Sequence, residues 1–94
     1  MMIQTHYLLR SRTDGNYLIA RPHGAADSGY LLLFAEYADA LSYLNAHAPE
    51  LRDRFAVETL PQSQLPTLLN RWGFAGIGVV RDPLVPQVSF LAQN

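Results

Sequence analysis

The hydrophobic and polar positions of this chain change their period several times, and each change predicts a new element. Residues 3–9 alternate between the two kinds of side chain, a period of two that is typical of a half-buried strand. Residues 17–21 are again rich in strand-forming side chains, and the Asp14-Gly15 pair before them favours a tight turn. We therefore expect the chain to begin with a β-hairpin.

The middle of the chain changes from a strand pattern to a helix pattern. Residues 30–34 form a continuous apolar run bounded by turn residues, which is typical of a central strand covered on both faces. Directly afterwards the spacing becomes three and four residues, which predicts an amphipathic helix from about residue 36 to residue 47, closed by Pro49. Its expected apolar face consists of Phe34, Tyr37, Ala38, Leu41, Leu44 and Ala48.

The second half predicts one more helix between strands. A charged connector at 50–54 leads to a short alternating strand at 55–60. A helix then runs to about Trp72, with Gly73 in the place of a left-handed C-terminal cap, and Pro66 requires either an irregular first turn or a regular helix that starts there. Its apolar stripe consists of Leu65, Leu68, Leu69 and Trp72. We expect further strands at 76–80 and 87–91, with a turn at 82–84 between them.

The resulting order is β-β-β-α-β-α-β-β, which predicts an α+β fold. Residues 1–94 are too few for two independent cores, so we expect a single domain. The simplest packing is a mainly antiparallel sheet of about five to six strands with two helices on one face.

Composition removes several classes of function. The formal net charge is −1, there is no lysine and the arginines are scattered, whereas phosphate neutralisation needs clustered cations, so we expect no nucleic-acid partner. The absence of cysteine excludes disulfides, thiolate chemistry and cysteine-ligated metals. The first residues do not resemble a signal peptide, and the longest apolar stretch is too short for a bilayer, so we expect a cytoplasmic protein without a membrane partner.

Catalytic and cofactor patterns are weak. The three histidines (His6, His23 and His47) lack paired ligand spacing, so we expect no metal. The glycine-rich segment 73–78 leaves a helix and enters a strand, the reverse of a phosphate-binding loop, so we expect no cofactor. Gly76 and Gly78 instead indicate close approach of a helix or another subunit. No serine has the flanking glycines of a nucleophile elbow, although His23 and Asp27 share a loop with Ser28, which leaves a hydrolase-type enzyme as a remote alternative.

The loop at residues 21–28 is the first place where we look for a ligand site. Arg21 and His23 could meet an anion there, together with Asp27, and with Arg81 if the strands bring it near. The competing interpretation is an ordinary solvated loop. A small-ligand-binding or sensor domain that uses this loop is therefore an alternative function.

An apolar strand followed by an acidic, alanine-rich helix at 33–40, a leucine-rich second helix, and a Gly-Ile-Gly-Val-Val strand that ends near Pro83 together span about two thirds of the chain. In this pattern the chain resembles the N-terminal domain of the SseB family, small bacterial α+β proteins. Asp82 stands where the family pattern has an asparagine. The resemblance implies a non-enzymatic domain linked to protein–protein association, and it implies no site residues.

Our leading hypothesis is a protein-interaction or regulatory module that acts as a homodimer or binds another protein. The core is small, and ten aromatic side chains are more than two thin layers need. Tyrosine and tryptophan are enriched at protein interfaces, and a first or last strand at an edge of the sheet could pair across a twofold axis.

Overall fold

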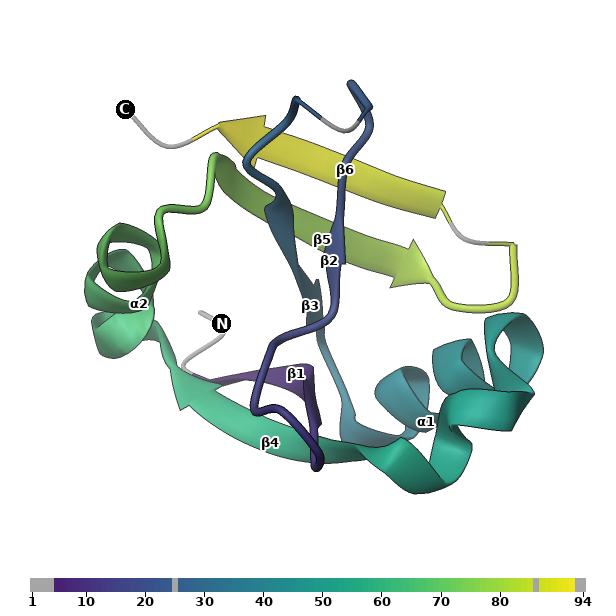
Figure 1. Cartoon of the computed structure of the whole chain (residues 1–94). Helices are drawn as coiled ribbons and strands as arrows, with labels where there is room; N and C mark the ends of the chain where they lie inside the picture. Colours follow the sequence, from purple (N-terminus) through teal and green to yellow (C-terminus); the bar gives the residue numbers. More distant parts are fainter. Residues whose placement is uncertain (1–4, 25, 86, 93–94) are drawn as a thin grey trace.

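The α+β class and the order of the elements are confirmed. The structure, a computed structural model, describes residues 5–24, 26–85 and 87–92. The elements follow one another as β1 (Thr5–Ser11), β2 (Ile19–Ala20), β3 (Tyr30–Phe34), α1 (Tyr37–His47), β4 (Phe55–Pro61), α2 (Leu65–Trp72), β5 (Gly76–Asp82) and β6 (Gln87–Ala92) (Figure 1). Two short 3-10 helices, Pro49–Arg54 and Gln62–Gln64, precede β4 and α2, the first of them in the expected charged connector. None of the helices in the described part of the chain is long and apolar enough to cross a membrane.

The strands form one mostly antiparallel sheet in the order β4-β1-β3-β5-β6, and β2 pairs with β3 beside this path. The β3–β5 pair is parallel, with Tyr30 opposite Gly76 and Phe34 opposite Val80. As expected from its uninterrupted apolar sequence, β3 lies in the middle of the sheet, and Leu31 and Leu33 are completely buried.

The N-terminal hairpin forms at its turn and then opens. The Ser11 N–H donates to the Asn16 carbonyl, and Gly15 has a φ of 75°, as a tight turn requires. Beyond the Arg10–Tyr17 bridge the second arm leaves β1 and pairs with β3, so that Ile19 lies opposite Leu31. The second strand is therefore shorter than expected, and its main partner is β3. Of the residues expected in the first strand, positions 3 and 4 lie outside the described residues.

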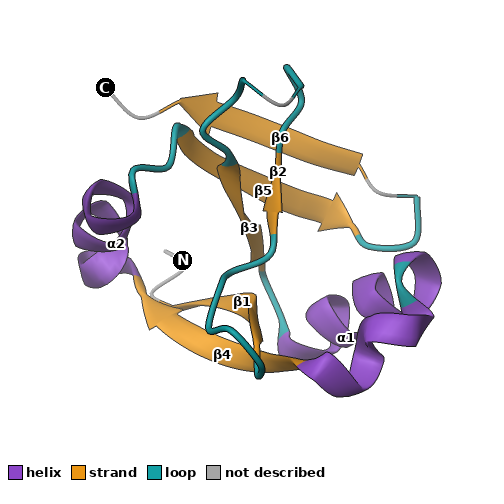
Figure 2. Ribbon diagram, viewed as in Figure 1, coloured by secondary structure: helices purple, strands orange, loops and turns teal. Residues whose placement is uncertain are grey.

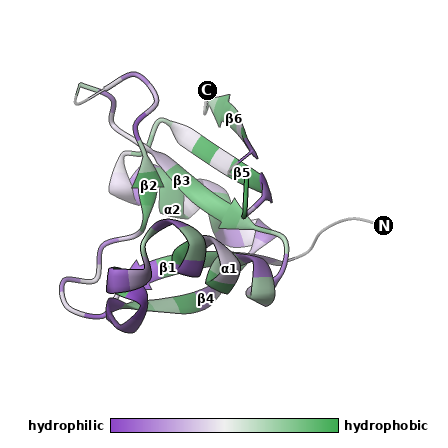
Figure 3. Ribbon diagram, turned by 90° about the vertical axis from the view of Figure 1, so that its right-hand side faces the viewer, coloured by the Kyte–Doolittle hydropathy of each residue, from purple (hydrophilic) through white to green (hydrophobic). Residues whose placement is uncertain are grey.

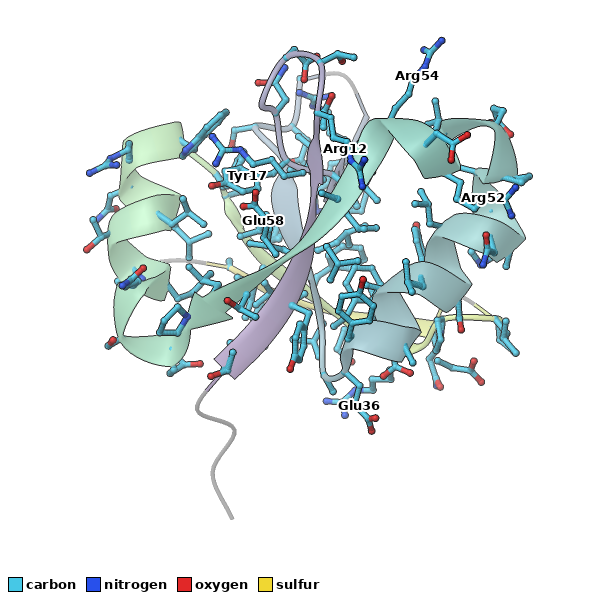
Figure 4. The ribbon with its side chains drawn as sticks, turned by 90° about the horizontal axis from the view of Figure 1, so that it is seen from below. Arg12, Tyr17, Glu36, Arg52, Arg54 and Glu58 are labelled. Atoms are coloured by element: carbon cyan, nitrogen blue, oxygen red, sulfur yellow. The ribbon has the colours of Figure 1, made fainter. Side chains whose placement is uncertain are left out.

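The expectation that both helices cover one face of the sheet is wrong. Alternate residues of β3 contact different helices: Leu31 and Leu33 share a core cluster with α2, whereas Leu32 and Phe34 share one with α1. Because successive side chains of a strand point to opposite faces, the two helices cover opposite faces. Figure 2 shows them on either side of the sheet, and in Figure 4 β1 and β4 pass between them. A sheet covered twice also explains why Leu8 and Leu9 of β1 are both buried.

The buried face of α1 also differs from the expected one. Ala40 and Leu44 are buried, whereas Tyr37 is 55% exposed and Leu41 is 37% exposed. Since apolar residues occur around much of this helix, the three-to-four spacing fits more than one face. Contact with Phe34 and Val80 decides which face is buried.

Gly73 at the end of α2 has its expected role, whereas Gly76 and Gly78 in β5 admit a different neighbour from the expected helix or second subunit. Gly73 adopts a φ of 70° and caps α2, and its N–H donates to the Leu69 carbonyl. A Cβ at Gly76 would lie within 2.0 Å of the Leu91 carbonyl oxygen, and one at Gly78 would lie 3.1 Å from the Phe90 ring. The close neighbours that these glycines admit are therefore β6 and, at Gly78, the Leu32 side chain of β3 at 3.0 Å, all in the same chain.

Candidate functional site

The loop at 21–28 is organised around the carboxylate of Asp27. This carboxylate accepts hydrogen bonds from the N–H groups of His23 (3.3 Å) and Gly29 (2.9 Å). The Nε of Arg21 donates to the backbone carbonyl of Asp27 at 3.1 Å. Arg21, His23 and Asp27 thus come together, as the sequence suggested, but through backbone groups that close the loop on itself.

This arrangement does not provide a catalytic pair. A general base needs its imidazole hydrogen-bonded to an orienting carboxylate, whereas the contact here uses the backbone nitrogen of His23. The side chain of His23 is exposed, as is Ser28. The loop is a turn whose backbone N–H groups are capped by the Asp27 carboxylate.

The structure places Arg81 away from the 21–28 loop. Ala20 pairs with Tyr30, which pairs with Gly76, so the loop lies beside the start of β5. Arg81 lies five residues further along that strand, which corresponds to roughly 16 Å. There its Nε donates to the hydroxyl of Ser89 at 2.7 Å. Arg81 therefore belongs to the β5–β6 hairpin.

The most distinctive surface lies along β6, the last strand of the sheet. It pairs with β5 on one side, and no other described strand pairs with its outer side. Phe90 is 40% exposed on the face of α1, and Leu91 is 57% exposed on the face of α2. In Figure 3, β6 forms a margin of the molecule, and much of it is coloured as hydrophobic. An unpaired strand edge with apolar side chains on both faces is a template for pairing with another strand.

An apolar pocket extends this surface toward α2. It has a volume of about 190 Å³ and is lined by Leu65, Pro66, Leu69, Ile77, Leu91 and Ala92. Two of these residues belong to β6, so a partner that pairs with the strand would also reach the pocket. Two further exposed apolar residues, Leu84 and Val85, lie in the turn before β6, at the opposite end of the strand from the pocket.

Of the two strands expected as possible edges, the first is wrong, because β1 lies between β4 and β3, whereas the last, β6, does lie at an edge. The sequence pattern did not identify the apolar surface along it. Residues 87–91 show the period of a strand, and that pattern does not reveal whether a neighbour covers the outer side. One signal was present: the segment Gln87–Ala92 contains neither a charge nor a proline, the residues that normally protect an edge.

The histidines of the described residues are dispersed. His6 contacts the amide of Gln62, and the Nε2 of His47 lies 2.8 Å from the Pro83 carbonyl, which can only accept, so this nitrogen carries the proton. Within the described ranges no three His, Asp or Glu side chains are grouped to hold a metal ion.

Comparison with known proteins gives no relative for this chain: no family model, curated protein or solved structure matches it. The resemblance to the SseB family therefore stays a prediction. Any proposal about function rests on the surfaces of this structure.

Proposed function

We propose that this protein is an interaction module that forms a homodimer by antiparallel pairing of β6 with β6 of a second copy. The observation that carries the proposal is the unprotected edge of β6, which has apolar side chains on both faces. The dimer then serves as a non-enzymatic binding or regulatory unit. Its cytoplasmic location stays a prediction, which fractionation of the host cell tests.

A second copy fits this edge because the strand is compatible with itself. Antiparallel pairing about a twofold axis places each residue of one strand against a residue of the same strand in the other copy. Charges of the same sign directly opposite each other destabilise such a pair. The segment Gln87–Ala92 has no charged side chain, so no register brings like charges together.

The symmetry also restricts the register. A twofold axis perpendicular to the sheet keeps the two faces distinct, so odd-numbered residues lie opposite odd-numbered ones, and even opposite even. If Ser89 lies on the axis, Phe90 faces Val88 of the other copy. If Phe90 lies on the axis, the two Phe90 rings face each other. Both registers bury the exposed aromatic ring.

Single cysteines test the dimer and its register together. The chain contains no cysteine, so each variant has one thiol and no background. Directly opposed residues of an antiparallel pair have Cα atoms about 4.5–5.5 Å apart, within the range that a disulfide spans. We expect either Ser89→Cys or Phe90→Cys to give a disulfide-linked dimer under mild oxidation, whichever residue lies on the axis.

The matched control is Thr59→Cys, at an exposed position on the opposite edge strand β4. This variant should remain uncrosslinked at the same concentration. Native mass spectrometry of the unmodified chain provides the independent measurement, with twice the chain mass as the expected result. A monomeric mass at all concentrations, together with no crosslink at Ser89, Phe90 or the flanking Val88, would overturn the proposal.

A further inference from the structure

A second pocket differs in chemistry from the apolar β6 edge, because it combines aromatic rings with an arginine. It has a volume of about 380 Å³ and is lined by Asn16, Tyr17, Ile19, Arg21, Ser28, Trp72 and Phe74. These residues come from the N-terminal hairpin, the 21–28 loop and the end of α2. The volume lies within the range of about 300–1,000 Å³ that is usual for small-ligand sites.

Three rings form the apolar wall of this pocket. The ring centroids of Tyr17 and Trp72 lie 4.9 Å apart in an edge-to-face arrangement. Trp72 and Phe74 lie 5.9 Å apart, with an angle of 23° between their planes. Trp72 is 36% exposed, so part of its ring is open to a planar group from solvent. In Figure 4, Tyr17 lies on the side of β4 that faces α2.

Contacts with neighbouring residues hold this wall in place. The Arg10 guanidinium lies over the Tyr17 ring, 4.8 Å from its centroid, and its Nε donates to the Gly15 carbonyl. The Ala75 N–H donates to the Gly29 carbonyl at 2.7 Å, which ties the segment after α2 to the 21–28 loop. The rings and the loop therefore keep a fixed relation to each other, which reduces the ordering cost of binding.

Arg21 supplies the charge of the pocket. Its Nε bond to the Asp27 carbonyl orients the guanidinium, and its two terminal nitrogens have no hydrogen-bond partner among the described residues. The lining contains no carboxylate. The Asp27 carboxylate nearby is already engaged by two backbone N–H groups. The hydroxyl of Ser28 adds a further donor at the same rim.

We infer that this pocket binds a small aromatic anion, a planar ring that carries a carboxylate or a phosphate. The ring stacks on Trp72 and Phe74, and the terminal nitrogens of Arg21 pair with the anionic group. A guanidinium presents parallel N–H donors that match two oxygens of such a group. This inference is independent of the proposed homodimer, because the pocket shares no lining residue with β6.

The chain provides its own probe, since Trp72 is its single tryptophan. We would titrate the protein with adenosine monophosphate and with benzoate and follow tryptophan fluorescence, with isothermal calorimetry as a second readout. The uncharged counterparts, adenosine and benzamide, measure stacking alone, and inorganic phosphate measures charge alone. Comparing the two anions shows whether the pocket prefers a nucleotide phosphate or an aromatic carboxylate.

We expect saturable quenching by at least one of the two anions and affinity at least about tenfold weaker for its uncharged counterpart, which corresponds to loss of a charge-assisted contact. Arg21→Gln should weaken the anion by a similar factor. Arg81→Gln, which removes an exposed arginine from the other end of the sheet, should leave the affinity unchanged. Circular dichroism of both variants confirms that they are folded.

Three results would each overturn the inference. The first is an absence of saturable quenching and of binding heat with both anions. The second is equal affinity for the charged and uncharged member of each pair. The third is an Arg21→Gln variant that is folded and binds the anion as tightly as the original chain.

Discussion

Strands β4 and β6 lie at opposite edges of the same sheet, and they differ in the residues that protect an edge from pairing with another strand. Along β4, Glu58 places a charge on the strand and pairs with Arg10 at 3.8 Å, and Pro61 occupies its last position. The segment Gln87–Ala92 has neither kind of residue and leaves Phe90 and Leu91 exposed. Charge and proline discourage a new strand from pairing, so β4 carries a protection against strand addition that β6 lacks.

The two edges also differ in how the core holds them. Leu60 of β4 is buried and belongs to the cluster beneath α2, whereas no residue of β6 is fully buried. β4 therefore contributes to the stability of the fold itself. β6 would gain further burial in the proposed homodimer.

The largest expected effect is on the free energy of unfolding, and it separates the contribution of β4 to stability from that of β6. Leu60→Ala should lower the free energy of unfolding by about 2–5 kcal/mol, because it leaves a cavity beneath α2. Leu91→Ala should change it by less than about 0.5 kcal/mol, because that side chain is largely exposed. Chemical denaturation at a concentration where the chain is monomeric measures both. Equal losses for the two variants would show that the edges do not differ as described.

A smaller effect follows from removing the protection of β4. Glu58→Val replaces the charge with a strand-forming apolar residue, and breaking an exposed ion pair costs only about 0–1 kcal/mol. We expect the variant to remain folded and to associate beyond the proposed dimer, since both edges can then pair. Light scattering after size-exclusion chromatography measures the mass. Glu50→Val, the same change in the exposed 3-10 helix before β4, should leave the mass unaltered.

The smallest expected effect is a loss of stability in acid that arises from Asp14, in the turn after β1. The Asn16 N–H donates to the Asp14 carboxylate, which together with Ser11 lowers the pKa of Asp14 below its usual 3.8. A lowered folded-state pKa gives stabilisation that is complete above pH 3.8 and is lost as the pH falls through the folded pKa. The melting temperature of the protein should therefore exceed that of Asp14→Asn near neutral pH, and the difference should shrink in acid.

Leu91→Ala provides the comparison for this titration. The segment Gln87–Ala92 has no titratable side chain, so this variant should lose stability in acid in parallel with the original chain. A difference between Asp14→Asn and the original chain that stayed constant from pH 5 to pH 2 would contradict the assigned role of the carboxylate.

Local sequence patterns predicted the elements well because their causes are local. The Asp14-Gly15 turn, the Gly73 cap and the apolar run of β3 each depend on the conformational preference or burial of a few neighbouring residues. The helix boundaries at 47 and 72 agree with the structure for the same reason.

The candidate site was predicted only in part. Arg21, His23 and Asp27 come together because they share one short loop. Arg81 joins them only if the strands bring it near, and the parallel β3–β5 register places it elsewhere. Trp72 was expected only as part of the apolar stripe of α2, because spacing along a helix does not reveal that the hairpin brings Tyr17 against its ring.

The α+β class, the order of the elements and the central position of β3 all follow from the sequence pattern. Tertiary packing places α1 and α2 on opposite faces, moves β2 from β1 to β3, and leaves no described strand on the outer side of β6. These features depend on contacts between residues that are distant in the chain. A periodic pattern states how many faces of an element are apolar, and only the packed structure shows which neighbour covers each face.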